Sequence, residues 1–243
     1  MADSATIPRL AAGVSTQAPT HTALVRVTHW ITALCFFALL VSGVELVISH
    51  PRFYWGETGN SLMPALFQLP IPASRAAVPT SYNFVLPDQN GWSRSLHFQS
   101  AWLVILTGLL YGGTSMFNGH LRKRLLPTDL SWTALSTAIG NHLRFRKPAE
   151  TTSYNILQQI AYLGVIFVAF PLMIWTGLAM SPAIMSTFPG VVTTLGGQQS
   201  ARTLHFFTTL SLILFLLVHI IMVCLAGFGN RMRAMTIKRQ ERP

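Results

Sequence analysis

The sequence predicts an all-α membrane protein, a bundle of four transmembrane helices. Of the 243 residues, 51% are hydrophobic and only 10% are charged, whereas a soluble domain carries about a quarter charged residues. Four long apolar runs each reach the roughly 20 residues with which a helix crosses about 30 Å of hydrocarbon. The predicted spans are about 24–50, 93–117, 153–180 and 201–227.

The net charge of +10 reflects membrane topology. Of the 17 Lys and Arg residues, thirteen lie in the N-terminal segment, in the loop 118–152 and in the tail. With four spans these segments share one side of the membrane, and the positive-inside rule places that side in the cytoplasm. We therefore expect both termini to be cytoplasmic, and we expect no binding of nucleic acid.

The rest of the chain divides around one membrane domain. Residues 1–22 are polar, without the apolar core of a signal peptide, and predict a flexible cytoplasmic N-terminus. Residues 23–228 form the four-helix domain, and residues 229–243 form a basic cytoplasmic tail. The periplasmic loop 51–92 contains the aromatic cluster Phe-Tyr-Trp at 53–55, which predicts an ordered loop packed on the membrane surface or on a partner.

The cytoplasmic loop 118–152 carries its own pattern. Apolar side chains recur at helical spacing, at Trp132, Leu135, Ile139 and Leu143. Basic residues follow them. This pattern is typical of an amphipathic helix on the inner membrane surface. A solvated linker helix is the alternative.

Three of the predicted helices begin with the same phrase, Arg-x-x-His. The phrases are RVTH with Arg26 and His29, RSLH with Arg94 and His97, and RTLH with Arg202 and His205. Because three residues are about one helical turn, each arginine lies on the same face as its histidine. A fourth histidine, His219, follows His205 by fourteen residues on the last span.

Alternating helix direction orders these histidines by depth. His29 starts a helix that begins inside, whereas His97 and His205 start helices that begin outside. At 1.5 Å per residue His219 lies about 21 Å deeper than His205, which returns it to the level of His29. Fourteen steps of about 100° also return the side chain to nearly the same face. The sequence thus predicts two pairs, His29 with His219 and His97 with His205.

Two histidines that face each other across a bundle can supply both axial ligands of a b-type haem. The predicted fold is therefore a four-transmembrane-helix bundle binding two b-type haems, with His29 and His219 on the inner iron and His97 and His205 on the outer iron. Arginine pairs well with carboxylate, so the haem propionates are predicted to bind Arg26, Arg94 and Arg202.

Other interpretations of these residues are available. A single histidine at a helix end is usually an interfacial residue. A zinc site would favour a tetrahedral cluster of histidines with Cys or carboxylates. The only carboxylate in the predicted spans is Glu45. Small residues near the haem levels either make room for a macrocycle or let helices pack closely; these are Gly43, Gly108, Gly164 and Gly177. The remaining histidines are predicted to be structural or solvated: His21, His50, His120 and His142.

The phrases RVTHW, WSRSLHF and RTLHF resemble the bacterial cytochrome b561 / nickel-dependent hydrogenase b-type cytochrome family. The segment HPRFYWGETG is similar to thiosulfate reductase cytochrome b subunits. The resemblance implies a diheme subunit of the bacterial inner membrane, without catalytic residues of its own. It would exchange electrons between menaquinone or ubiquinone and a periplasmic partner, often a molybdopterin oxidoreductase.

The resemblance also implies a quinone pocket near the inner haem. The phrase YNILQQ matches the opening of the family's third helix, which points to Asn155, with Gln158 and Trp30 as companions. A helix cap is the alternative role for Asn155.

Two other functions are consistent with a haem-binding membrane bundle. A stand-alone superoxide:quinone oxidoreductase would be an enzyme in its own right, and it needs a basic funnel that attracts anions. The outer loops instead mix both signs of charge: Arg52, Glu57, Arg75 and Asp88. A haem-containing membrane scaffold or sensor would bind haem without being reduced by quinol.

Overall fold

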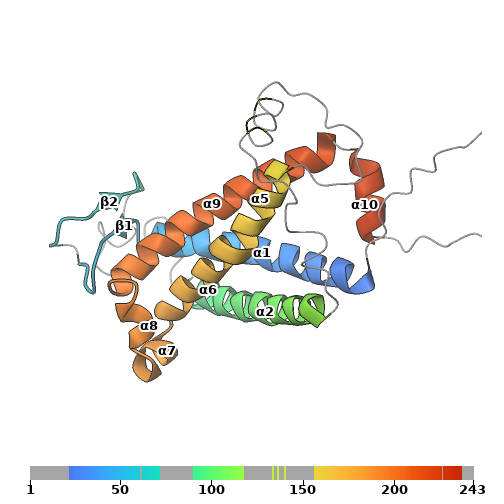
Figure 1. The fold of residues 1–243 in the computed structure, drawn as a ribbon. Coiled ribbons are helices and arrows are strands. Elements are labelled where there is room, and N and C mark those ends of the chain that lie inside the picture. Colours follow the sequence, from blue (N-terminus) through green and yellow to red (C-terminus); the bar gives the residue numbers. More distant parts are fainter. Residues whose placement is uncertain are drawn as a thin grey trace, which may run out of the picture.

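The computed structural model describes residues 22–60, 62–71, 90–117, 156–225 and 227–236, and the single positions 133, 136 and 140. This part of the chain is mostly helical (Figure 1). The amphipathic helix predicted within the loop 118–152 lies outside the described residues, apart from those three positions.

Helix α1 (Ala23–Ser49) and helix α2 (Asn90–Phe117) form an antiparallel pair (Figure 1). The hydroxyl of Thr22 caps the start of α1 by accepting a hydrogen bond from the Val25 amide, as Ser and Thr commonly do at helix N-termini. Helix α1 ends at Ser49, shortly before Pro51, because a proline disfavours helical backbone in the residue before it.

The third span is one continuous helical rod with an irregular middle. It consists of α5 (Ile156–Gly164), the π-helical turn η1 (Val165–Ala169) and α6 (Phe170–Ala179). Pro171 lacks an amide hydrogen for the regular helical ladder, and the wide turn ends two residues before it. This rod packs along α9 (Gln198–Leu225). Two short helices, α7 (Pro182–Thr187) and α8 (Gly190–Thr193), connect the two (Figure 1).

The observed helices begin and end within about three residues of the four predicted spans. Among the described residues, three helical stretches are long and apolar enough to cross a membrane: Ala23–Ser49, Ile160–Ala179 and Gln198–Leu225. Helix α2 is equally long but begins with polar residues such as Ser93, His97 and Gln99, and it is not one of these three. A fourth span at α2 stays a prediction.

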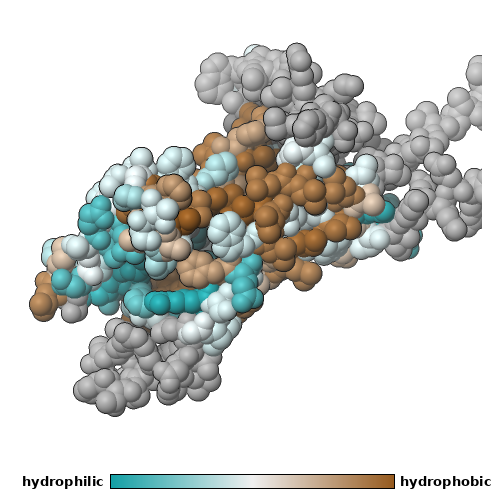
Figure 2. Space-filling model, turned by 90° about the horizontal axis from the view of Figure 1, so that it is seen from below, coloured by the Kyte–Doolittle hydropathy of each residue, from teal (hydrophilic) through white to brown (hydrophobic). Residues whose placement is uncertain are grey.

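The surface of the helices matches a lipid environment. Large apolar side chains point outward along α1, α2 and α9, including Leu34, Val41, Leu109, Leu210 and Leu214. Figure 2 shows a broad hydrophobic band on one face of the helices, with hydrophilic residues gathered at one end. The protein is therefore a membrane protein.

Small hydroxyl residues fill the contacts between the helices. The buried set includes Ser42, Ser100, Thr107, Thr176 and Thr208. Most of these hydroxyls donate to the backbone carbonyl four residues earlier, as in Ser42 to Ala38 and Thr208 to Leu204. Small residues let membrane helices approach closely.

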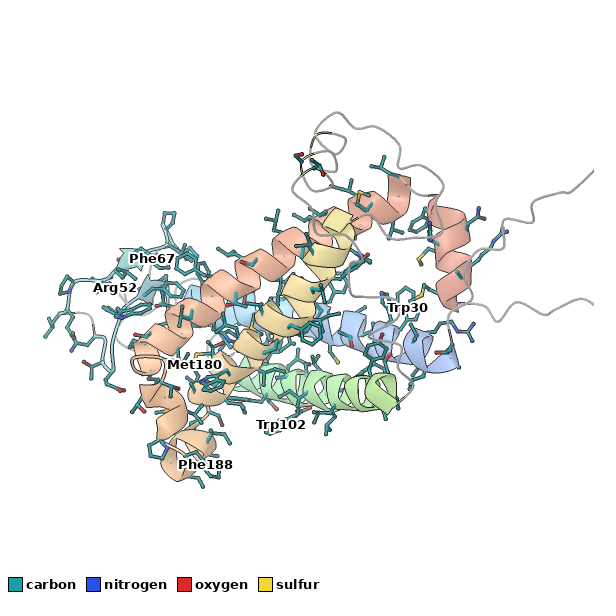
Figure 3. All side chains as sticks on the ribbon, in the orientation of Figure 1. Trp30, Arg52, Phe67, Trp102, Met180 and Phe188 are labelled. Atoms are coloured by element: carbon teal, nitrogen blue, oxygen red, sulfur yellow. The ribbon has the colours of Figure 1, made fainter. Side chains whose placement is uncertain are left out.

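The loop after α1 folds onto the start of α9. Strand β1 (Arg52–Phe53) pairs antiparallel with β2 (Phe67–Gln68). Phe53 is 1% exposed and stacks on Phe67 with ring centroids 4.6 Å apart. Figure 3 shows Arg52 and Phe67 at this end and Trp30 at the opposite end, beside α10 (Phe228–Thr236). We call the two ends the loop side and the tail side.

Candidate functional site

The structure brings the four histidines of the sequence pattern together as two pairs. At the loop side, His97 of α2 faces His205 of α9, with ring centroids 6.2 Å apart. At the tail side, His29 of α1 faces His219 of α9, with centroids 6.5 Å apart. Helix α9 therefore contributes one histidine to each pair. We call His97 with His205 the loop-side pair and His29 with His219 the tail-side pair.

These spacings fit two imidazoles on opposite sides of one metal ion. An imidazole nitrogen binds a first-row metal ion at about 2.0–2.1 Å. Since that nitrogen lies about 1.1–1.2 Å from the ring centroid, two opposed ligands have centroids about 6.2–6.6 Å apart. Both measured distances fall within this interval. Each pair can thus fill the two axial positions of an iron held in a planar macrocycle.

Two hydroxyls hold the rings of the loop-side pair. The Oγ of Ser42 lies 2.9 Å from Nδ1 of His97, and the Oγ1 of Thr176 lies 2.9 Å from Nδ1 of His205. Ser42 is on α1 and Thr176 on α6, so each hydroxyl reaches a histidine on the neighbouring helix of its own helix pair. In both histidines the contact occupies Nδ1 and leaves Nε2 for other bonds.

A glycine follows each of these hydroxyl residues and contacts the same ring. A Cβ at Gly43 would lie 3.5 Å from Cε1 of His97, and a Cβ at Gly177 would lie 3.5 Å from Cε1 of His205. These two glycines therefore bring the helix backbone against the imidazoles. Around Gly108 and Gly164 a Cβ would meet nothing within 4 Å among the described residues.

An aromatic ring contacts each histidine of the tail-side pair. Phe215 stacks on His219 with centroids 5.9 Å apart and an interplanar angle of 22°. Trp30 meets His29 edge-on, at 5.4 Å and 88°. The Trp30 Nε1 donates a 3.0 Å hydrogen bond to the Met235 carbonyl, which ties α1 to α10.

A groove lies beside Trp30. It has a volume of about 460 Å³ and lies between the start of α1 and the end of α10. Its lining includes Arg26, Ile31, Leu34 and Thr236. The size is that of a small-molecule site, and the indole that lines the groove also contacts His29.

Residues 20–238 match the protein family described as prokaryotic cytochrome b561. The chain belongs to this family. The match extends from before α1 to beyond α10 and confirms the resemblance drawn from the Arg-x-x-His phrases. This cytochrome b561 protein is thus a membrane b-type cytochrome that binds haem b and transfers electrons.

Two curated proteins are similar to this cytochrome over most of its length. The putative protein-methionine-sulfoxide reductase subunit YedZ1 of Azospira oryzae is 28% identical over 212 residues, which cover 84% of this chain and 90% of that protein. The probable Ni/Fe-hydrogenase B-type cytochrome subunit of Cupriavidus necator is 26% identical over 214 residues, which cover 82% of this chain and 76% of that protein.

The three arginines of the repeated phrase have different surroundings in this cytochrome. Arg202 donates from Nη2 to the His50 carbonyl, and its guanidinium carbon lies 4.8 Å from the Phe53 ring centroid. Arg202 thereby fastens the loop to α9. Arg94 is exposed, and Arg26 lines the tail-side groove. Binding of propionates by these arginines stays a prediction.

Backbone contacts seal the loop onto the N-terminus of α9. The Gly56 carbonyl accepts hydrogen bonds from the amides of Gln199 and Ser200, which have no partners within the helix. Thr203 Oγ1 donates to the Tyr54 carbonyl at 2.8 Å. At Gly197 the φ angle is +110°, and a Cβ would lie 2.5 Å from the Gly56 carbonyl carbon. Only glycine fits this position.

The predicted quinone residues are placed unequally. Trp30 lies beside His29, as described above, whereas Asn155 lies outside the described residues. Gln158 is on α5, and its side chain is outside the described part.

The sequence interpretation missed Ser42 and Thr176. It singled out the glycines that follow them, and the pairs Ser-Gly and Thr-Gly at the level of the outer histidines were the available signal.

Proposed function

We propose that this cytochrome carries electrons across the bacterial inner membrane between a quinone at the tail side and a redox protein at the loop side. The tail side is the cytoplasmic face and the loop side the periplasmic face, with α2 as the fourth span. Two haem b groups are held by the two histidine pairs, and the haem irons supply the one-electron steps.

The observation that carries this proposal is the position of His205 and His219 on one helix. They are fourteen residues apart on α9, about 21 Å along the axis. Each meets a histidine from the α1–α2 pair at the spacing that one metal ion requires. Helix α9 thus links two sites at different depths, as electron transfer between the two faces requires.

The tail side is the better place for a quinone. Among the described residues its groove of about 460 Å³ is lined by apolar side chains and by the cation Arg26, and Trp30 both lines the groove and contacts His29. An apolar pocket with few polar groups suits a hydrophobic ring that carries two carbonyls. Asn155 and Gln158 are proposed to complete the pocket from the third span.

The loop side is the better place for a protein partner. The loop presents an exposed surface that includes Trp55 and Leu62, while Phe53 and Tyr54 fix it to α9. Both relatives are named as subunits of redox enzymes, which supports a redox partner for this chain. We propose a periplasmic molybdopterin oxidoreductase as that partner.

The test is electron transfer across a closed vesicle. The purified cytochrome is reconstituted into liposomes with ferricyanide trapped inside, and dithionite is added outside. The wild type is expected to bleach the trapped ferricyanide much faster than protein-free liposomes do, because electrons pass between the two histidine pairs.

The matched controls are His205→Ala and His50→Ala. His205→Ala removes one ligand of the loop-side pair and should reduce bleaching to the protein-free rate. His50→Ala removes a loop histidine whose observed contact to Arg202 is through its backbone, so it should bleach like the wild type. Equal rates for wild type and His205→Ala would refute the proposed function.

A further inference from the structure

We propose that Ser42 and Thr176 are positioning residues that fix the ring tautomer of the loop-side histidines. Each hydroxyl would keep the proton of its histidine on Nδ1, so that Nε2 has a free lone pair for iron. This inference rests on the proposed haem site and adds to it the two residues that set its ligand chemistry.

The direction of each hydrogen bond follows from the available protons. The Ser42 Oγ lies 2.7 Å from the Ala38 carbonyl, and the Thr176 Oγ1 lies 2.8 Å from the Leu172 carbonyl. In both cases the carbonyl lies closer to the hydroxyl oxygen than Nδ1 does, and a carbonyl can only accept, so we assign the single hydroxyl proton to the carbonyl. The oxygen lone pair that remains faces Nδ1 of the histidine at 2.9 Å. With the hydroxyl proton donated to the carbonyl, Nδ1 is the donor and Nε2 is left unprotonated.

Burial supports this assignment. Ser42 and Thr176 are both 0% exposed, so water does not compete for their oxygens. A histidine bound to a metal through one nitrogen donates its other N–H to a fixed acceptor, which orients the ring and raises its basicity. The two hydroxyls provide that acceptor before any metal is bound.

The same arrangement, a hydroxyl residue followed by a glycine against a histidine ring, occurs twice in the fold. Ser42-Gly43 on α1 serves His97, and Thr176-Gly177 on α6 serves His205. In each case the hydroxyl binds Nδ1 and the next residue brings the backbone against Cε1. Two separate helix pairs thus present their histidines in the same way, which a chance contact does not explain.

The chemical consequence is a difference in redox potential. A donating Nδ1–H gives the imidazole more anionic character, and a more basic ligand stabilises the oxidised iron. Removing the acceptor should therefore shift the potential of the loop-side haem to more positive values. The tail-side haem should be unaffected.

The experiment is a potentiometric titration of the purified full-length cytochrome, with haem content measured in parallel. The variants are Ser42→Ala and Thr176→Val, the latter preserving shape. We expect two haems per chain in each, with one midpoint potential raised and the other unchanged. Thr176→Ser, which keeps a hydroxyl, should restore the wild-type potential.

Two matched controls separate this effect from loss of a buried hydroxyl in general. Thr107 and Thr208 are each 6% exposed and donate to a carbonyl four residues earlier, at 2.6 and 2.8 Å. Within the described part of the chain their hydroxyls contact backbone only. Thr107→Val and Thr208→Val should leave both potentials unchanged.

The outcomes distinguish this inference from the proposed function. Unchanged potentials in Ser42→Ala and Thr176→Val, with two haems retained, would overturn the inference and leave the haem sites intact. A wild type without haem would overturn the proposed function itself, and the inference with it. If Thr176→Val loses the loop-side haem, then Thr176→Ser must regain it; failure to do so would also overturn the inference.

Discussion

The loop-side and tail-side histidine pairs have nearly the same ring spacing, 6.2 and 6.5 Å, but different surroundings. At the loop side, buried hydroxyls hold both rings, and a folded loop is fastened to the adjoining end of α9. At the tail side, aromatic rings contact both histidines, and a groove opens next to Trp30.

The comparison separates what the bundle determines from what local residues determine. The ring spacing follows from helix geometry, because α9 contributes to both pairs and α1 and α2 contribute one histidine each. The hydrogen bonds of the histidine rings, their exposure and the access of small molecules to them depend on single residues near each pair. We infer that the loop side is built for exchange with a protein and the tail side for exchange with a small molecule.

The largest expected effect concerns the contact between the loop after α1 and the N-terminus of α9. Gly197→Ala would place a Cβ 2.5 Å from the Gly56 carbonyl carbon at a φ of +110°. Backbone strain of this kind costs about 1–3 kcal/mol, and the clash adds to it. We expect a lower thermal unfolding temperature and faster proteolysis within the loop 51–71. Gly190→Ala, where a Cβ would meet none of the described residues within 4 Å, is the matched control and should behave like the wild type.

The next effect concerns the proposed quinone pocket. Asn155→Ala would remove one amide from the proposed pocket, and a lost hydrogen bond of about 1.4 kcal/mol corresponds to roughly tenfold in rate. We expect menaquinol-driven haem reduction to slow by about this factor, measured by stopped-flow absorbance. An unchanged rate would remove Asn155 from the pocket.

The smallest effect concerns the wall of the groove. Trp30→Phe keeps an aromatic ring beside His29 but loses the hydrogen bond from Nε1 to the Met235 carbonyl, worth about 1 kcal/mol. We expect a few-fold higher KM for quinol with the haem content unchanged. Trp175→Phe loses a comparable bond to the Val191 carbonyl at the loop side. Equal KM increases in both variants would contradict a tail-side quinone site.

Much of this architecture could be predicted from sequence because it depends on regular periods. Span length follows from hydrocarbon thickness, and the spacing of His205 and His219 fixes their depth on any straight helix. The same regularity predicted which histidine meets which. The family was also readable from the Arg-x-x-His phrases and is confirmed.

The remaining features depend on contacts between distant segments. Ser42 and His97 are 55 residues apart, and Gly56 and Ser200 are 144 apart, so no local pattern reveals either contact. Arg202 shows the same limit, because its phrase predicts a position near His205 but not its contacts with His50 and Phe53. The groove also required α10 to fold back onto Trp30.

Haem content per chain tests the central proposal most directly. Wild type, His205→Ala and His219→Ala are purified after expression with ample haem supply, and haem is measured as the pyridine haemochrome against total protein. The two histidine pairs predict two haems in the wild type and about one in each variant, with low-spin spectra. Two low-spin haems retained in both variants would contradict the pairing.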